Sequence, residues 1–388
     1  MEGQGEFVVP PESRVLFCFE EQQMGLGKIV VAMSGGVDSS VAAFLLKDAG
    51  YDVSGVTMRL WTPEAGGDQP YNKRCCSVED VADAQAAAAV IGIPHYTINF
   101  EREFRTGVID YFLDEYRRGR TPHPCIACNQ RVKFDPLLER ATAIGADLLA
   151  TGHYARVDQV DGRYRLRRAV DPEKDQSYVL YGLGQAELGR LCFPVGNYTK
   201  LQIRRTAADA GLALADKPDS QDICFVPKGS YREFVAKHVE PSPGIIVDLS
   251  GETVGEHEGV EFFTVGQRRH LGIAGPEPSY VVSIDAETRT VVVGGRDDVY
   301  GDALWADEVR YVDGKGPPAP REVMVKYRYK SAMVRAVLHP EDSRARVEFA
   351  EPQRALTPGQ AVVFYEGDEV LGGGVIQGAA VPAFSVGS

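Results

Sequence analysis

Two groups of residues in this chain are suited to chemistry, a serine- and glycine-rich string and a set of cysteines. The string Ser34-Gly35-Gly36-Val37-Asp38-Ser39-Ser40 directly follows a short apolar run. Glycines allow the backbone to turn tightly and approach an anion, and a helix that begins there offers unpaired N–H groups and the positive end of its dipole. The string therefore predicts a phosphate-binding loop. It is not a Walker A loop, because the Gly-Lys-Ser/Thr ending is missing.

The second group is the pair Cys125 and Cys128, with Pro122 and Pro124 before it and a third cysteine, Cys224, far along the chain. The prolines predict a fixed loop. Two cysteines at this spacing suit metal ligation or redox chemistry, since both sulfurs can face one point. A structural zinc site is the alternative, and it would need a fourth ligand such as His123 or His153.

The elements that must position these residues follow two patterns. Apolar runs alternate with helical stretches in the first half, which predicts a parallel sheet covered by helices on both faces. The expected strands are 28–33, 53–58, 95–99 and 148–151, and the expected helices are 41–46, 80–91, 103–117 and 137–144. Short β-branched runs follow after Cys224, at 244–249, 260–265, 280–284, 290–293, 335–338, 344–349 and 361–365. They predict a small β domain followed by a β barrel.

A chain of 388 residues is too long for one ordinary core. We expect a poorly ordered extension over 1–27, a catalytic α/β domain over 28–225, a central β-rich domain over 226–300 and a C-terminal barrel over 301–388.

Charge and cysteine content narrow the class of protein. The net charge of −13 and the pI of about 5.1 argue mildly against a nucleic-acid partner. Basic residues nevertheless cluster at Arg117, Arg118 and Arg120, at Arg163, Arg165, Arg167 and Arg168, and at Lys326, Arg328 and Lys330. The odd number of cysteines, seven, and the lack of a secretory signal predict reduced thiols in a cytoplasmic protein without membrane contact.

The string matches SGGxDS, the signature of the PP-loop ATP pyrophosphatases, which cleave ATP between the α- and β-phosphates and leave an adenylated substrate. The chain as a whole resembles the tRNA-specific 2-thiouridylases, and the matching motifs cover nearly everything after residue 27 in order. They are Gly55 to Trp61, Gly119 to Pro122, Lys133-Phe134, Ala150 to Tyr154, Lys174 to Tyr178, Phe263 to Arg268 and Leu356 to Gln360.

The resemblance implies an activity: ATP and Mg²⁺ serve to adenylate the 2-oxygen of the anticodon wobble uridine, and sulfur replaces that oxygen. It implies ATP binding by Ala32, Met33, Ser34, Gly35, Gly36, Val37, Asp38, Ser39, Met58 and Gly152. It makes Cys128 the nucleophile and Cys224 the carrier of a persulfide, and the two can later close as a disulfide. His123, Pro124 and Cys125 would lie beside the target base, and the other tRNA contacts would be His153, Lys174, Asp175, Gln176, Lys326, Tyr327 and Gln360.

The chain departs from the family at one point, because it has His123-Pro124-Cys125 where many members have Asn-Pro-Asp. Three thiolates at Cys125, Cys128 and Cys224 would suit a [4Fe–4S] cluster that delivers sulfide. Two mechanisms therefore stay open, a persulfide relay, which we favour slightly, and a cluster. The implied partners are tRNAs such as those for Lys, Glu and Gln and a sulfur donor, either a cysteine desulfurase or a relay protein. We expect a monomer.

Two other functions remain. A PP-loop synthetase that adenylates a small molecule for nitrogen transfer would need neither the cysteine pair nor Cys224. An RNA-binding protein with a structural zinc would release no pyrophosphate from ATP.

Overall fold

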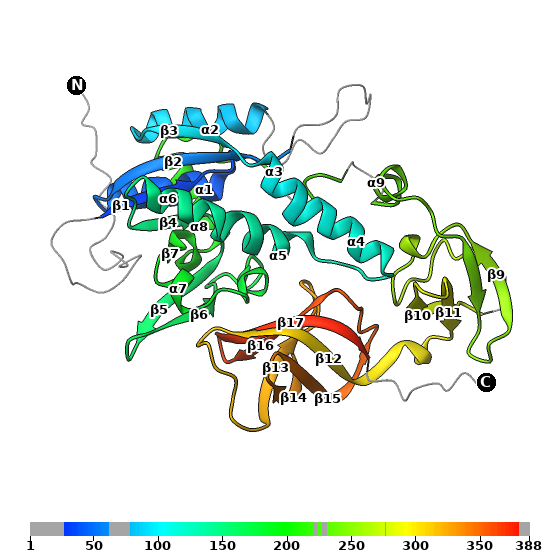
Figure 1. Ribbon diagram of the computed structural model, residues 1–388. Coiled ribbons are helices and arrows are strands. Elements are labelled where there is room, and N and C mark those ends of the chain that lie inside the picture. Colours follow the sequence, from blue (N-terminus) through cyan, green and yellow to red (C-terminus); the bar gives the residue numbers. More distant parts are fainter. Residues whose placement is uncertain (1–26, 62–77, 220–222, 227–230, 276, 380–388) are drawn as a thin grey trace, which may run out of the picture.

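The first half of the chain forms a five-stranded parallel sheet, in the computed structural model that describes residues 27–61, 78–219, 223–226, 231–275 and 277–379. Its strands lie in the order β3-β2-β1-β4-β7 (Figure 1). Their bounds are β1 Lys28–Ala32, β2 Asp52–Arg59, β3 His95–Asn99, β4 Leu148–Thr151 and β7 Leu191–Cys192. The predicted extension over 1–27 lies outside the described residues except for its last residue.

Helices cover both faces of this sheet. Alternate side chains of β1 enter different cores, as expected for a strand buried on both sides: Ile29 and Val31 pack in one cluster and Val30 in the other. The first core contains residues of α1 Val37–Asp48, α2 Val78–Ile91 and α8 Lys200–Asp209. The second contains residues of α3 Glu101–Phe104, α4 Tyr111–Arg117, α5 Pro124–Cys128 and α6 Pro136–Ala143.

Two π-helical stretches make these short helices continuous. Arg105–Asp110 joins α3 to α4, and Asn129–Phe134 follows α5 and leads to α6. The long helix expected over 103–117 is therefore present, with a π segment inside it. The fixed loop expected at the cysteine pair is wrong, because Pro124 occupies the first turn of α5 and its ring angle suits that position.

A smaller sheet follows the helix α9 Tyr231–His238, at the right of Figure 1. It has the order β10-β11-β8-β9, with bounds β8 Gly244–Val247, β9 Thr253–His257, β10 Tyr280–Asp285 and β11 Thr290–Gly294. The strand expected over 260–265 is wrong. Val260–Phe262 forms a 3₁₀ turn instead, and Val260, Phe262 and Phe263 are buried there without strand pairing.

The last part of the chain is a closed barrel, with its first strand paired to its last. Its strands are β12 Tyr300–Tyr311, β13 Arg321–Lys326, β14 Val334–Glu341, β15 Arg344–Arg354, β16 Ala361–Glu366 and β17 Glu369–Ala379. The hairpin β5 Ala155–Val160 and β6 Arg163–Arg168 comes from the first half, yet β6 pairs with β17. The barrel is thereby joined to the domain that carries the phosphate loop. A short helix, α7 Gln185–Leu188, follows this hairpin in the chain.

The fold class expected from the sequence is confirmed: a parallel-sheet domain, a middle β-rich part and a C-terminal barrel. Among the described residues, no helix is both long enough and apolar enough to cross a membrane.

Candidate active site

The serine- and glycine-rich string forms the turn between β1 and α1. Gly35 has a φ of +71°, and a Cβ there would collide with the carbonyl oxygen of Asp80 in α2, so this position requires glycine. The Ser39 hydroxyl accepts a hydrogen bond from the Ser34 N–H at 3.0 Å. The turn is held in this way at the start of α1, where the first N–H groups of a helix lack partners within the helix.

The chain moves to the opposite side of β1 between β3 and β4, so β1 and β4 are neighbours where the strand order changes direction. In open parallel sheets, ligands bind outside the carboxyl ends of the strands at such a point. Gly152 follows β4 and packs on the phosphate loop. A Cβ on Gly152 would lie 2.6 Å from the Ser39 nitrogen and 2.8 Å from the Asp38 carbonyl carbon. The structure therefore brings Gly152 and the loop together.

The other residues expected at the ATP site lie at the same edge of the sheet. Ala32 is the last residue of β1 and pairs with Thr151 of β4. Thr57 in β2 donates a hydrogen bond from its hydroxyl to the Met33 carbonyl at 2.8 Å. Met58 is buried next to the end of β2.

Asp38 of the loop is held by two side chains that the sequence analysis did not select. The Lys200 ammonium lies 2.7 and 2.9 Å from the two Asp38 carboxylate oxygens. The Tyr154 hydroxyl donates to Asp38 Oδ1 at 2.7 Å. Burial and the neighbouring Asp38 charge raise the pKa of Tyr154, so this phenol stays protonated and remains a donor.

Asp219 extends this network. Its carboxylate lies 2.8 Å from the Lys200 ammonium, 2.9 Å from that of Lys174 and 3.1 Å from the Arg204 guanidinium. Burial alone would raise the pKa of Asp219, but the hydrogen bonds from Lys200 and Lys174 lower it to about 2. The Asp219 carboxylate is therefore ionised at neutral pH.

Lys217 supports the phosphate loop from the other side. Its ammonium donates to the Gly35 carbonyl at 2.8 Å, to Asp80 at 2.8 Å and to Asp83 at 2.6 Å. The sequence did contain a signal that lysines such as Lys200 and Lys217 are needed. The loop itself contains no basic residue, so a phosphate site needs cations from elsewhere in the chain.

The cysteine pair lies on α5. Cys125 is exposed and Cys128 is buried, although residues three apart are neighbours on a helix. Cys128 belongs to the large core cluster that includes the sheet face, and Cys224 is partly buried against the same cluster. Phe225, the residue after Cys224, packs edge-on against Phe112 with ring centroids 5.3 Å apart.

The three cysteines do not form a ligand set. In the part of the chain that the structure describes, which includes all three, no group of three or more His, Cys, Asp or Glu side chains is placed to hold a metal ion. Cys125 faces solvent while Cys128 is buried in the core. The residues present therefore do not fit the [4Fe–4S] cluster or the structural zinc considered from the sequence.

His123 precedes α5 and contacts two tyrosines. Its ring centroid lies 5.8 Å from that of Tyr178 and 6.0 Å from that of Tyr329, and burial lowers the pKa of His123 to about 4. Burial raises the pKa of Tyr329, and the charges of Asp175 and Cys125 raise it further. Tyr329 is thus a residue of this site that sequence reasoning missed.

Thr121 is a junction of three parts of the chain. Its N–H donates to the Pro358 carbonyl at 2.8 Å, and its hydroxyl bonds to that of Thr264 in the middle part at 3.1 Å. Gln360 Nε2 donates to the Thr121 carbonyl at 2.7 Å. The structure therefore places Gln360, expected to contact tRNA, where it fixes the approach to α5.

The segment 174–176 was also expected to contact tRNA, and its side chains are engaged within the protein. Lys174 pairs with Asp219, as described above. Asp175 is buried and accepts hydrogen bonds from the N–H groups of Ala169 and Ser177 at 3.1 and 3.2 Å. Gln176 accepts one from the Tyr154 N–H at 2.9 Å.

The other residues expected to contact tRNA lie at the barrel, for Lys326 and Tyr327, and after β4, for His153. Burial lowers the pKa of Lys326 at the end of β13. The ring of Tyr327 meets that of Phe349 inside the barrel, with centroids 5.8 Å apart. His153 packs between Phe134 and Phe193, with centroids 5.8 and 6.1 Å away, and burial lowers its pKa well below the usual value.

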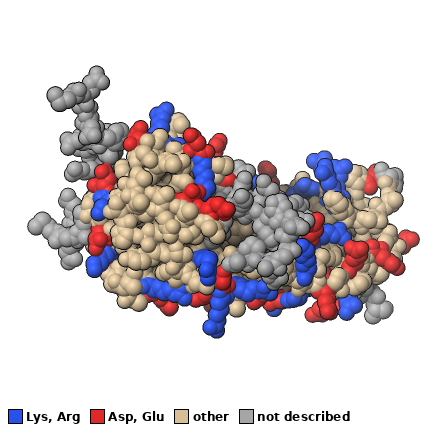
Figure 2. Space-filling view, turned by 90° about the horizontal axis from the view of Figure 1, so that it is seen from above, with Lys and Arg blue, Asp and Glu red and all other residues tan. Residues whose placement is uncertain are grey.

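The arginine cluster of β6 is paired with acidic residues. Arg167 lies 2.7 Å from Asp158 and 2.8 Å from Asp368, and Arg165 lies 3.3 Å from Glu369. The pair with Asp158 lies within the β5–β6 hairpin, and the pairs with Asp368 and Glu369 connect this hairpin to the start of β17. Acidic and basic side chains are likewise interspersed over the face seen in Figure 2.

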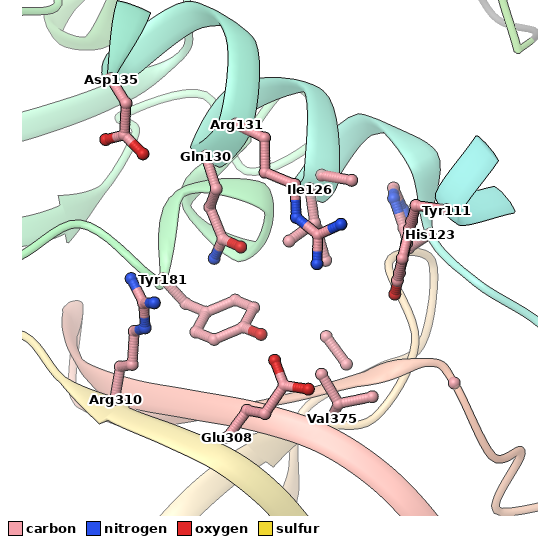
Figure 3. A pocket seen from close by; sticks show the side chains of 13 residues that line it. Tyr111, His123, Ile126, Gln130, Arg131, Asp135, Tyr181, Glu308, Arg310 and Val375 are labelled. Carbon is pink, nitrogen blue, oxygen red and sulfur yellow. The ribbon is translucent and has the colours of Figure 1, made fainter. Parts of the chain in front are cut away.

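A cavity of about 110 Å³ lies between α5 and the barrel (Figure 3). Arg131 and Gln130 face it from the helical side, and Glu308 and Arg310 face it from β12. Neither Cys125 nor Cys128 lines this cavity. His123, Ile126 and Ala127 also line it, so the cavity borders the segment that carries the cysteine pair.

Three family models match the chain in order. The model described as "tRNA methyl transferase HUP domain" matches residues 27–228. The model described as "tRNA methyl transferase PRC-barrel domain" matches residues 232–295, and the one described as "Aminomethyltransferase beta-barrel domain" matches residues 301–376.

Curated relatives match over almost the whole chain. A tRNA-specific 2-thiouridylase of Heliobacterium modesticaldum is 50% identical over 355 residues, which are 90% of this chain and 92% of the relative. Proteins of the same name from Roseiflexus castenholzii and Moorella thermoacetica are each 48% identical, and each match covers 90% of this chain and 99% of the relative.

Proposed function

Because the chain belongs to the family of tRNA-specific 2-thiouridylases, we propose that its phosphate loop and its cysteines carry out the two halves of sulfur transfer to tRNA. The chain is an ATP-dependent tRNA-uridine 2-sulfurtransferase. The observation that supports the assignment of residues is the position of Asp38 and the loop at the β1–β4 crevice, together with Cys128 and Cys224 on one core cluster.

The first half is adenylation. The loop N–H groups and the hydroxyls of Ser34 and Ser39 bind the ATP phosphates at the start of α1, and Gly152 leaves room for that arrangement. Asp38 would hold Mg²⁺, which would neutralise phosphate charge. The uridine 2-oxygen attacks the α-phosphorus, the bond to the β-phosphate breaks, and pyrophosphate leaves. The adenylated oxygen then departs as AMP, which is a far better leaving group than oxide.

The second half is sulfur delivery. The Cys224 thiolate attacks the outer sulfur of a cysteine persulfide on the donor protein, whose S–S bond breaks and whose thiolate leaves, so that Cys224 becomes a persulfide. The terminal sulfur of Cys224 then attacks C2 of the adenylated uridine, the C2–O bond breaks and AMP is released. The Cys128 thiolate then attacks the Cys224 sulfur. The bond between the Cys224 sulfur and the sulfur on the base breaks, and its electron pair stays on the thiouridine sulfur. A disulfide between Cys128 and Cys224 results, and a dithiol reductant must reopen it.

Alternative chemistry fits the residues less well. Methyl transfer, named in the descriptions of the family models, needs neither an adenylating loop nor a pair of cysteines. Nitrogen transfer by a PP-loop synthetase would not use Cys128 and Cys224.

The finer details are part of the same proposal. The substrates are tRNAs with a modifiable wobble uridine, such as those for Lys, Glu and Gln. The donor is a cysteine desulfurase or a sulfur relay protein, and the enzyme acts as a monomer. Its catalytic domain spans 28–225, its central domain 226–300 and its barrel domain 301–388.

Pyrophosphate release tests the proposal. The wild-type chain with ATP and Mg²⁺ is expected to release pyrophosphate when bulk tRNA is present and to release little without it. Asp38→Asn should abolish release while a gel shift still shows tRNA binding. Release that is independent of tRNA, or the absence of a gel shift with the wild-type chain, would contradict an RNA substrate.

A further inference from the structure

The phosphate loop lacks its own cation. ATP brings several negative charges, and the string Ser34 to Ser40 contains Asp38 but no lysine or arginine. Walker A loops place a lysine inside the loop, where it reaches the β- and γ-phosphates. A cation for this loop must therefore come from another element of the fold.

Lys200 lies at the required place. It is the first residue of α8, which packs against α1. Its side chain is only 11% exposed, and its ammonium group contacts the Asp38 carboxylate in the loop itself. A largely buried ammonium beside a phosphate loop is a strong electrostatic feature, because solvent screens it less than it screens a surface charge.

The position of Lys200 is fixed from several sides. Thr199 caps α8, with the Thr199 N–H donating to Gln202 Oε1 at 2.8 Å and the Gln202 N–H donating to the Thr199 hydroxyl at 3.4 Å. The Lys200 N–H donates to Asp171 at 2.9 Å. The Lys200 ammonium lies 5.8 Å from the centre of the Tyr154 ring. These contacts hold the start of α8, and with it the Lys200 side chain, beside the phosphate loop.

The two acidic partners of Lys200 allow its ammonium group to exchange one of its present contacts for a contact to phosphate. One partner, Asp38, is the proposed magnesium ligand. The other, Asp219, is also paired with Lys174 and Arg204, so it stays neutralised when Lys200 shares its charge with a new anion. Lys217 differs, because its three donors are taken up by Gly35, Asp80 and Asp83. It positions the loop and has no donor left for phosphate.

We propose that Lys200 is a further catalytic residue, whose ammonium group leaves Asp38 when Mg²⁺ and ATP bind and contacts the β- and γ-phosphates. There it stabilises the negative charge that develops on pyrophosphate as the bond to the α-phosphate breaks. This inference rests on the proposed adenylation reaction. It adds a residue from outside the loop, more than 160 positions from Asp38 in the chain.

The test compares Lys200→Met with Lys200→Arg and with a matched control, Lys47→Met, which removes an exposed lysine from the last turn of α1. Binding of ATP with Mg²⁺, of inorganic pyrophosphate and of AMP is measured by titration calorimetry. Lys200→Met is expected to weaken the binding of ATP and of pyrophosphate by roughly 10- to 100-fold, which corresponds to the loss of a charge-assisted hydrogen bond. It should leave AMP binding unchanged. Lys200→Arg should restore part of the loss, and Lys47→Met should behave as the wild type.

Two results would overturn the inference. The first is that the Lys200→Met variant binds ATP and pyrophosphate with wild-type affinity. The second is that this variant loses as much affinity for AMP as for ATP and pyrophosphate, which would indicate a structural role. Failure of the underlying function is seen separately, because the wild-type chain would then release no pyrophosphate with ATP and tRNA.

Discussion

Gly152→Ala tests the contact between β4 and the phosphate loop. A Cβ at this position would lie 2.6 Å from the Ser39 nitrogen and 2.9 Å from the Ser39 Cα. Both are backbone atoms, which cannot rotate away as a flexible side chain does. The loop must therefore move relative to β4. In the variant, ATP binding must either return the loop to its original position, at a cost in free energy, or proceed with fewer contacts between the loop and the phosphates.

The expected size follows from the cost of overpacking. Inserting one methyl group against rigid neighbours costs about 1–3 kcal/mol. If this cost falls on the ATP-bound arrangement, the dissociation constant for ATP rises by roughly 5- to 150-fold. Titration calorimetry with ATP and Mg²⁺ measures this change, and pyrophosphate release at saturating tRNA should fall with it.

Gly378→Ala is the matched control. Gly378 lies in β17, and a Cβ there would meet no heavy atom within 4 Å. This variant should bind ATP as the wild type does, and far-ultraviolet circular dichroism should show both variants folded. A folded Gly152→Ala protein with wild-type affinity for ATP would refute the assignment of this crevice as the ATP site.

Four further predictions follow from the same structure. Cys128→Ala and Cys224→Ala should each abolish thiolation while tRNA affinity in a gel shift stays nearly unchanged; loss of tRNA binding would indicate a structural role. Protein purified without oxygen should contain no stoichiometric iron or acid-labile sulfide and show no visible absorption band, and about four of each per chain would restore the cluster mechanism. Because the pKa of His123 is about 4 in the folded chain and near 6.5 in an unfolded one, stability is lost as pH falls from 6.5 to 4, by up to about 3 kcal/mol; the urea midpoint of His123→Gln should fall less over this range. Arg167→Gln should leave both tRNA affinity and its salt dependence unchanged, because that guanidinium is paired within the protein; a shallower salt slope would show that it contacts phosphate.

The parallel sheet could be predicted well from the sequence. The expected strand 95–99 coincides with β3, which lies at the edge of the sheet and is mostly exposed. The expected strand 148–151 coincides with β4, because a short apolar run suits a buried strand. The run 260–265 was misread for the same reason. Its apolar residues are buried in and beside a 3₁₀ turn, and a short apolar run does not distinguish the two.

The last strand of the barrel was not predictable from local pattern. β17 contains Gly372, Gly373 and Gly374, which are poor strand formers. Glycine is needed there because of tertiary contacts: a Cβ on Gly373 would lie 2.5 Å from the Val362 carbonyl oxygen, and one on Gly374 would lie 2.8 Å from that of Asp307. These neighbours are visible only in the fold.

The candidate site also contains residues that could be predicted from local sequence and residues that could not. The loop and the cysteine pair were found because their residues are adjacent in the chain. Lys200 and Asp219 were missed because the contacts of Lys200 with Asp38 and with Asp219 join distant segments, and a lone lysine or aspartate carries no motif. The arginines of β6 were visible as a cluster, but the sequence did not show that Glu369 pairs with Arg165 and Asp368 with Arg167.

The central claim is that this chain uses ATP to place sulfur on the wobble uridine through Cys128 and Cys224. The most direct measurement is mass spectrometry of the wobble nucleoside after incubation of unmodified tRNA with the chain, ATP, Mg²⁺, a dithiol and a cysteine desulfurase with cysteine. The account predicts 2-thiouridine at that position, one AMP formed for each thiouridine, and neither product with Asp38→Asn. Unmodified uridine after incubation with active wild-type protein, or thiouridine formed by the Cys128→Ala, Cys224→Ala double variant, would contradict it.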